Sequence, residues 1–203
     1  DLFSKEEIPE QISDHFVYSE YLYNIQAKVL KRYHNIQPDV LYRGDDVWDI
    51  ATHNASSKVS STKGTEITPY YTMVKTTDST TSRLGLVIPF TPYEKQNVTA
   101  YLVGSTDENG NNVLKLYNYP TDSNVLGPMQ LDTQLGQDET IAKEIENLNV
   151  SGTKLSKDII IVPINNTLLY VEPIYQQFVN ETDSLPVLKK VVVASGNKVA
   201  IGN

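Results

Sequence analysis

The chain has 203 residues and a formal net charge of −8, with 39% hydrophobic and 21% charged residues. This composition can supply one core in one domain, or two small ones, and it excludes collagen and coiled-coil proteins. The net acidity argues against nucleic acid as a partner, because binding to phosphates requires a basic face. The sequence contains no cysteine, which excludes disulfides, thiolate metal ligands and cysteine nucleophiles.

The first 35 residues favour helices. Pro9 suits a first helical turn and indicates a short helix near residues 8–15. Ser19 is a typical N-cap and Glu20 follows where the helix dipole favours an anion, so a second helix is predicted over residues 19–34. Apolar residues recur in it at helical spacing and form one stripe of an amphipathic helix: Leu22, Ile25, Val29, Leu30 and Tyr33.

Strand patterns dominate from residue 65 onward. Asn109-Gly110 and Gly196-Asn197 each indicate a hairpin turn between two apolar runs. Residues 122–130 are interpreted as irregular, whereas residues 138–148 predict a short acidic helix. Strands are expected at residues 66–75, 84–90, 98–103, 113–119, 158–164, 168–177 and 187–194. The predicted fold class is α+β, with N-terminal helices followed by a largely antiparallel β-sheet and one further short helix.

Residues 1–203 are interpreted as a single soluble domain that carries an exposed polar loop, rich in Ser and Thr, at residues 53–65. No apolar run approaches the roughly 18 residues that span a bilayer. The sequence has no initiator methionine and stops in an apolar segment. We therefore expect the chain to be a fragment of a longer protein.

The most concentrated polar group is the acidic segment, residues 42–49 (YRGDDVWD), which contains the only tryptophan. Asp45, Asp46 and Asp49 could ligate a hard cation or supply a pair of carboxylates for acid–base chemistry. Trp48 could instead form a platform for a sugar ring. The structural alternative is a glycine turn that leads into a helix, with Trp48 anchored in the core.

Glu172 is a further candidate for ligand binding. It lies inside a predicted strand, where alternation places it on the same face as Tyr170. A buried carboxylate there would have a perturbed pKa, although a structural hydrogen bond or ion pair is the interpretation we favour. The only histidines, His15, His34 and His53, lack the spacing of a helix-borne zinc site. No metal site, cofactor or assignable catalytic residue is therefore predicted.

Several blocks of sequence, taken together and in order, resemble one family. The blocks are His34, the acidic segment, Pro69-Tyr70-Tyr71, Pro89-Phe90-Thr91-Pro92, Gln96-Asn97, Gly127-Pro128-Met129-Gln130, residues 168–175 (LLYVEPIY) and residues 191–202 (VVVASGNKVAIG). The chain is similar over nearly its whole length to the UPF0182 family of large bacterial multi-pass membrane proteins, whose function is uncharacterised. The polar loop at residues 53–65 is where it resembles the family least.

The resemblance implies a place in a larger molecule. Members of the family have membrane-spanning segments toward the N-terminus and then a large soluble region, and this chain resembles the latter part of that region. The implied partners are the membrane-spanning part of the same polypeptide and an envelope or cell-wall ligand. The implied location is the cell membrane, on the extracytoplasmic side, with a structural, assembly or ligand-binding role rather than an enzymatic one. The family brings no established catalytic residues.

Two alternatives to that role stay open. The first is a metal-dependent or hydrolytic module that uses Asp45, Asp46 and Asp49. The second is a surface for cell-wall carbohydrate, built from Trp48 and the tyrosines of the predicted strands.

Overall fold

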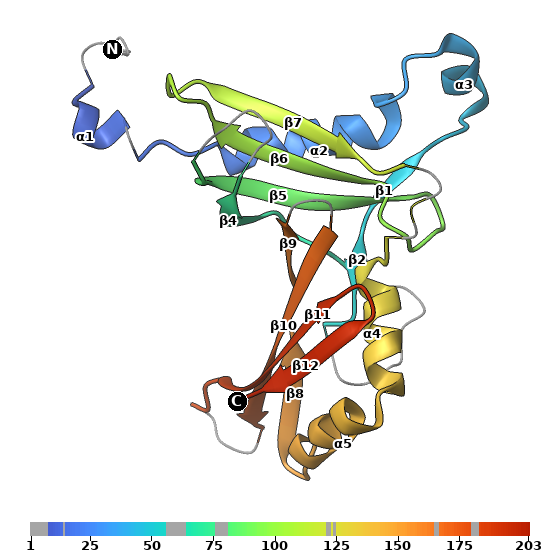
Figure 1. The fold of residues 1–203 in the computed structure, drawn as a ribbon, viewed down its shortest axis with the longest axis vertical. Coiled ribbons are helices and arrows are strands. Elements are labelled where there is room, and N and C mark those ends of the chain that lie inside the picture. Colours follow the sequence, from blue (N-terminus) through green and yellow to red (C-terminus); the bar gives the residue numbers. More distant parts are fainter. Residues whose placement is uncertain are drawn as a thin grey trace.

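The structure, a computed structural model, contains two five-stranded antiparallel sheets, one above the other in the view of Figure 1, each with helices beside it. It describes residues 8–13, 15–55, 64–75, 81–120, 123, 125–164, 167–179 and 183–203. The upper sheet and the N-terminal helices come from the first part of the chain, and the lower sheet comes from the last part.

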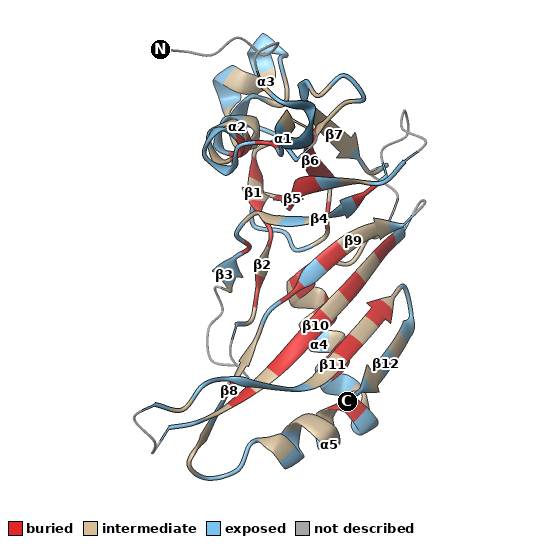
Figure 2. Ribbon diagram, turned by 90° about the vertical axis from the view of Figure 1, so that its left-hand side faces the viewer, coloured by how far each residue is buried: buried red, intermediate tan, exposed pale blue. Residues whose placement is uncertain are grey.

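The upper sheet is organised around one central strand whose middle residues are buried. Its members are β1 (Trp48–Ile50), β4 (Tyr70–Val74), β5 (Arg83–Pro92), β6 (Ala100–Thr106) and β7 (Asn112–Asn118). β5 pairs with β1, β4 and β6, and β7 pairs with the far edge of β6. Leu86, Val87 and Ile88 of β5 have no exposed surface, which is the pattern of a strand covered on both faces. Figure 2 shows this concentration of buried residues along β5 and β6.

The lower sheet has the same plan, with a long strand in the centre. Its members are β8 (Thr153–Lys157), β9 (Ile160–Ile164), β10 (Thr167–Phe178), β11 (Val187–Ser195) and β12 (Lys198–Gly202). β10 pairs with β11 along one edge, and with β9 and then β8 along the other. Leu168, Tyr170, Glu172 and Ile174 are buried while Leu169 and Val171 are only half-buried, so alternation sets which side chains of β10 enter the interior.

Two helices, α4 (Pro128–Gln137) and α5 (Glu139–Leu148), lie beside the lower sheet. α4 begins where the chain passes unusually close to another segment. A Cβ atom added to Gly127 would lie 1.6 Å from the carbonyl oxygen of Gln96. The Gly127 N–H donates to Oε1 of Gln130 at 2.9 Å, and Nε2 of Gln130 donates to Oδ1 of Asn97 at 3.1 Å. Two blocks that carry the family resemblance thus meet in space.

The N-terminal helices are α1 (Glu10–Ser13), α2 (Glu20–Tyr33) and α3 (Pro38–Arg43). α2 lies across one face of the upper sheet (Figures 1 and 2) and buries Tyr23 and Ala27 there. The Tyr23 hydroxyl donates to the carbonyl of Leu102 in β6 at 2.8 Å. The helix predicted from the sequence over residues 19–34 is confirmed to within one residue at each end, since α2 spans Glu20–Tyr33.

The apolar stripe predicted on α2 is not the face that packs on the sheet. Of its five residues only Leu30 packs, partly buried, against the core. Leu22, Ile25, Val29 and Tyr33 are 40, 43, 45 and 62% exposed. Because Tyr23 and Ala27 supply the buried face, α2 is apolar on two sides.

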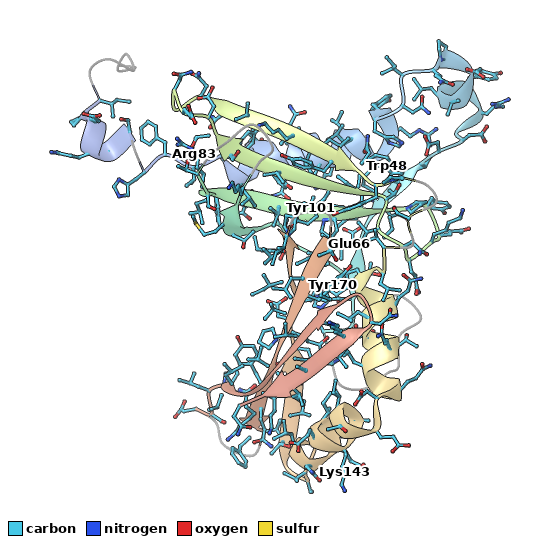
Figure 3. All side chains as sticks on the ribbon, viewed as in Figure 1. Trp48, Glu66, Arg83, Tyr101, Lys143 and Tyr170 are labelled. Carbon is cyan, nitrogen blue, oxygen red and sulfur yellow. The ribbon has the colours of Figure 1, made fainter. Side chains whose placement is uncertain are left out.

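The two sheets are joined at the backbone of Ile161 in β9. The hydroxyls of Tyr70 in β4 and Tyr101 in β6 donate to the Ile161 carbonyl at 2.7 and 2.6 Å, and the Ile161 N–H donates to the Tyr70 oxygen at 2.6 Å. Figure 3 places Tyr101 on the side of the upper sheet that faces the lower sheet. Burial raises the pKa of Tyr70 to about 12, so both groups stay protonated as donors at neutral pH.

The α+β class and the antiparallel pairing predicted from the sequence are confirmed. The expectation of one sheet with one further helix is too simple, because the strands divide into two sheets and α3 and α4 were not predicted. The irregular stretch proposed at residues 122–130 is wrong from Pro128 onward, where α4 starts. The strand proposed at residues 66–75 is interrupted before Tyr70, because Pro69 has no N–H to donate to a ladder.

The exposed loop predicted at residues 53–65 is wrong at both ends. His53 is 8% exposed and lies in β2 (Thr52–His53), which pairs with β3 (Thr65–Glu66) between the two sheets. Residues 56–63 lie outside the described part of the chain. Among the described residues, no helix combines the length and the apolar character that crossing a bilayer requires.

The hydrogen bonds of Tyr70 and Tyr101 to the backbone of Ile161, here called the tyrosine junction, predict which of two substitutions destabilises the protein more. Tyr70→Phe removes both a donor and an acceptor, so we expect the free energy of unfolding to fall by about 1–3 kcal/mol. Tyr101→Phe leaves the Ile161 carbonyl bonded to Tyr70, and the loss should be smaller, about 0.5–1.5 kcal/mol. Urea unfolding followed by circular dichroism measures both. The matched control is Tyr93→Phe at an exposed position; losses no larger than its own would refute the junction.

A pair of glycines tests the close approach at the start of α4. Gly127→Ala places a methyl group against the Gln96 backbone, and we expect a loss of about 3 kcal/mol or failure to fold. Gly136→Ala, in an exposed part of the same helix with nothing near the new Cβ, should stabilise by about 0.5–1 kcal/mol. Thermal melts of the two variants should therefore shift in opposite directions, and equal shifts would contradict the geometry.

Candidate functional site

The acidic segment forms a turn that ends one helix and starts one strand. Gly44 takes the left-handed conformation with φ 70°, and its N–H donates to the carbonyl of Leu41. Asp46 is also left-handed, with φ 52°. The chain then enters β1 at Trp48, which is 6% exposed. The expected anchoring of Trp48 is confirmed, but the turn follows a helix instead of leading into one.

Each of the three carboxylates of the acidic segment lies next to a different basic side chain. Arg43 Nε lies 2.8 Å from Oδ2 of Asp45. Lys31 Nζ lies 3.1 Å from Oδ1 of Asp49. Asp46 faces the histidine described next, so the three carboxylates do not converge. Over the described ranges, no group of three or more histidine, aspartate or glutamate side chains is placed to hold a metal ion.

His34 covers the tryptophan. The imidazole and indole rings are stacked, with centroids 3.4 Å apart and planes 13° apart. Nδ1 lies 2.9 Å from the carbonyl oxygen of Leu30 and must donate to it, because a carbonyl can only accept. Nε2 then lies 3.3 Å from Oδ2 of Asp46. One face of Trp48 is thus occupied from within the chain.

Asp46 is held as an anion by this arrangement. Its pKa is lowered, mainly by the hydrogen bond from Asn35 Nδ2 at 3.0 Å. Burial has the next largest effect and opposes the shift, while His34 and Trp48 add to it. The carboxylate is half-exposed, so the energetic effect is screened by solvent. Asp46, just before β1, thus contacts Asn35 and His34, just after α2, and connects the ends of these two elements beside the stacked rings.

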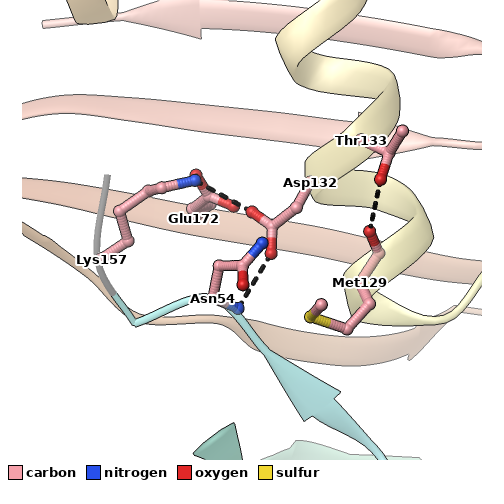
Figure 4. Close-up of polar contacts among 6 residues, drawn as sticks. All are labelled: Asn54, Met129, Asp132, Thr133, Lys157 and Glu172. Carbon is pink, nitrogen blue, oxygen red and sulfur yellow. Dashed lines mark hydrogen bonds and ion pairs between the residues drawn. The ribbon is translucent and has the colours of Figure 1, made fainter. Parts of the chain in front are cut away.

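Glu172, the remaining candidate, lies in a buried charge cluster that we define as Asp132, Lys157 and Glu172 (Figure 4). Nζ of Lys157 donates to Oδ1 of Asp132 and to Oε1 of Glu172, each at 2.9 Å. The three side chains are 4, 10 and 3% exposed. They come from α4, β8 and β10, so the cluster fastens a helix to the lower sheet.

The cluster also holds the strand that crosses between the sheets. The Asn54 N–H, directly after β2, donates to Oδ2 of Asp132 at 3.0 Å. The Lys157 N–H donates to the carbonyl of Ala55 at 3.1 Å. His53 is buried nearby, and burial lowers its pKa more than the carboxylates of Asp132 and Asp158 raise it. The imidazole is therefore neutral at neutral pH.

One cation between two carboxylates leaves a net negative charge in the interior. Burial, and the neighbouring carboxylate of Asp132, raise the pKa of Glu172 to about 7, although Lys157 opposes the shift. The two carboxylates in turn raise the pKa of Lys157, against the effect of its own burial. The physical cause is the cost of holding a second anion in a low dielectric next to one ammonium group.

Sequence analysis found only one member of this cluster. Glu172 was marked by alternation along its strand, and the structural ion pair favoured for it is present. Asp132 and Lys157 carried no local signal, since their partners lie 25 and 15 residues away. The remaining histidine, His15, is exposed just after α1 and contacts the carbonyl of Gln11 in that helix.

The described candidates thus sit in two groups, the stacked rings with their locked carboxylate above and the buried charge cluster below. Together with two antiparallel sheets and their flanking helices, they define an α+β fold in which each candidate carboxylate lies next to a basic side chain. The model of the UPF0182 uncharacterised protein family matches residues 1–148. The chain belongs to this family.

Individual relatives match almost the entire chain. It is 36% identical to a UPF0182 protein of Caldicellulosiruptor saccharolyticus over all of its length. It is 34% identical to one of Microcystis aeruginosa and 30% identical to one of Desulforamulus reducens, each over 96% of its length. The chain spans only 22, 20 and 20% of the lengths of these three relatives. No solved structure matches it.

The raised pKa of Glu172 predicts an unusual pH dependence of stability. The folded state keeps the proton up to a pH of about 7, while an unfolded chain releases it near 4.5, so the folded state binds more protons in this window. The free energy of unfolding should therefore fall as the pH rises from 5 to 7.5. In Glu172→Gln this loss should shrink, by on the order of 2 kcal/mol.

Chemical denaturation at several pH values measures the effect as the difference between variant and wild type. The matched control is Glu146→Gln, an exposed glutamate of α5, which should leave the wild-type slope unchanged. An identical slope in the wild type and in Glu172→Gln would show that Glu172 is ionised throughout this range.

Proposed function

We propose that this chain is an extracytoplasmic, non-catalytic region of a multi-pass bacterial membrane protein, where it serves assembly or the binding of an envelope ligand. The observation that carries the proposal is the internal pairing of the candidate carboxylates. Asp45, Asp46 and Asp49 each face a different basic side chain of their own neighbourhood. Carboxylates that each have a separate partner do not converge on one point, as the ligands of a metal ion or the acid–base pair of a hydrolase must.

The lengths of the relatives support the proposal that this chain is one region of a longer membrane protein. The relatives are about five times as long as this chain, so a region of this size is one part of a larger molecule. The resemblance of its sequence blocks to the soluble region of a membrane-embedded family favours attachment to the cell membrane. The membrane-spanning part of the same polypeptide is then its first partner.

The two alternatives receive less support. A metal-dependent or hydrolytic module needs the carboxylates of the acidic segment to converge, and each instead has a separate partner. A carbohydrate platform needs an open aromatic face, whereas Trp48 is 6% exposed and is stacked against His34. Both remain hypotheses about ligands, but neither has an observation that favours it over a scaffold.

The side of the membrane can be tested with a single cysteine. The chain has none of its own, and Lys143 is an exposed residue of α5 at the lower end of the molecule (Figure 3). We predict that Lys143→Cys, in an otherwise cysteine-free full-length protein, reacts with a membrane-impermeant maleimide in intact bacteria. The extent of labelling before and after permeabilisation is measured by a mass shift.

The matched control is Leu135→Cys in the neighbouring helix, where the side chain is 1% exposed. This thiol should label only after denaturation, which excludes leaky or unfolded protein as the source of the signal. Labelling of Lys143→Cys that requires permeabilisation would place the region in the cytoplasm and overturn the extracytoplasmic assignment.

A further inference from the structure

The outer stripe of α2, defined as Leu22, Ile25, Val29 and Tyr33, has the composition of a buried helix face but lies in water. The four residues follow one another at offsets of three, four and four, so they form a continuous ridge. They are 40–62% exposed. At about 100° per residue, the packed face with Tyr23 and Ala27 lies roughly a third of a turn away, so the outer stripe is a second apolar face beside the packed one.

Further large apolar side chains are exposed near the two ends of α2. The segments just before and just after α2 expose further large apolar side chains, with Phe16 at 41%, Ile36 at 85% and Tyr42 at 93%. Figure 1 shows α2 along the upper sheet, with α1 beyond one end of it and α3 beyond the other. Large apolar side chains that stay exposed in a row along a helix indicate an interaction site.

We propose that the outer stripe is a docking surface for an apolar helix that belongs to the same polypeptide and lies outside these 203 residues. The inference rests on the proposed function, because it requires this region to be part of a longer chain. A ridge with spacings of three and four residues fits between the side-chain rows of another helix. The occupant is thus a helix with a complementary apolar face.

The length of chain that remains supports this occupant. In the relatives about four-fifths of the polypeptide lies outside the part that this chain matches. Fourteen helical residues extend about 21 Å, so one face buries only a few hundred Å². That is below the roughly 800 Å² per partner of a stable association between separate molecules. A tethered segment needs less area, because its effective concentration is millimolar.

The size of the ridge therefore argues against a second copy of the chain. A lipid surface is also disfavoured, since a helix at a membrane interface keeps its other face polar and in water. The other face of α2 is fixed on the sheet through Tyr23 and Ala27. The net charge of −8 adds repulsion from anionic lipids.

Photo-crosslinking in the full-length protein tests the proposal. A benzoylphenylalanine is incorporated at Val29, and the protein is purified in detergent, irradiated at low concentration and digested for mass spectrometry. We expect the dominant crosslink to join α2 to a peptide outside residues 1–203, within a product of monomeric mass. The same probe at Lys143, on exposed α5, should give about tenfold less crosslink to such peptides.

A second variant shows whether the contact depends on apolar packing. Val29→Asp changes an exposed position, so the region itself should remain folded. A thiol at Leu22→Cys in the full-length protein should then become about tenfold more reactive toward maleimide than in the background without the aspartate. Unchanged reactivity would show that nothing covers the outer stripe.

Other crosslinking results overturn the proposal in ways that can be told apart. Dimeric products that join two copies of α2 would identify a second copy as the occupant, and crosslinks to lipid that appear only in bilayer discs would identify the membrane. A yield equal to that at Lys143 would leave the stripe without an occupant. None of these readouts depends on the side of the membrane, so the docking surface and the extracytoplasmic assignment can fail separately.

Discussion

The two halves of this molecule are positioned by hydrogen bonds from two tyrosine hydroxyls to one peptide unit. One edge of β9 pairs with β10, and its other edge would be open at Ile161 if Tyr70 and Tyr101 did not reach it from the upper sheet. Buried backbone groups need partners, so the tyrosines fix where the lower sheet can stand. The buried charge cluster makes a second connection, because it links the chain directly after β2 to helix α4 and the lower sheet.

Charged side chains, like the backbone groups of Ile161, find their partners in neighbouring elements of the fold. The chain is acidic overall, yet its clustered carboxylates face cations or hydrogen-bond donors from neighbouring elements. In the acidic segment these pairs are partly exposed and contribute little individually to stability. In the buried charge cluster the same chemistry is desolvated, so Asp132 and Glu172 share Lys157 and one of them is forced toward its protonated form. Position in the fold decides the energetic weight of each pair.

Sequence patterns predicted the elements whose signals are local. The helix at residues 20–33, the Gly110 and Gly196 hairpins and the alternation along β10 were all recovered, because each depends on neighbours a few residues apart. The face of α2 that packs was not recovered, because hydrophobicity alone cannot distinguish a face covered by the sheet from one that is exposed. Tyr23 is amphipathic, and its burial depends on the Leu102 carbonyl of a strand far along the chain.

The site was predictable to the same limited extent. The burial of Trp48 and an ion-paired Glu172 followed from residue type and alternation, whereas the His34 ring stacked on Trp48 required knowledge of how α2 meets β1. Lys157 illustrates the remaining difficulty. A single lysine in a polar stretch has no sequence feature that marks it as buried, and its role arises from two carboxylates brought to it by the fold.

The tyrosine junction has a consequence for how such a sequence can diverge. Both hydroxyls bond to main-chain atoms of residue 161, so an apolar replacement of that isoleucine that preserves its fit in the interior leaves the junction intact. The tyrosines have no such freedom, because phenylalanine matches their shape but lacks the oxygen. A substitution at residue 161 therefore requires no compensating substitution at Tyr70 or Tyr101. A search for correlated substitutions would miss the hydrogen bonds that join the two sheets.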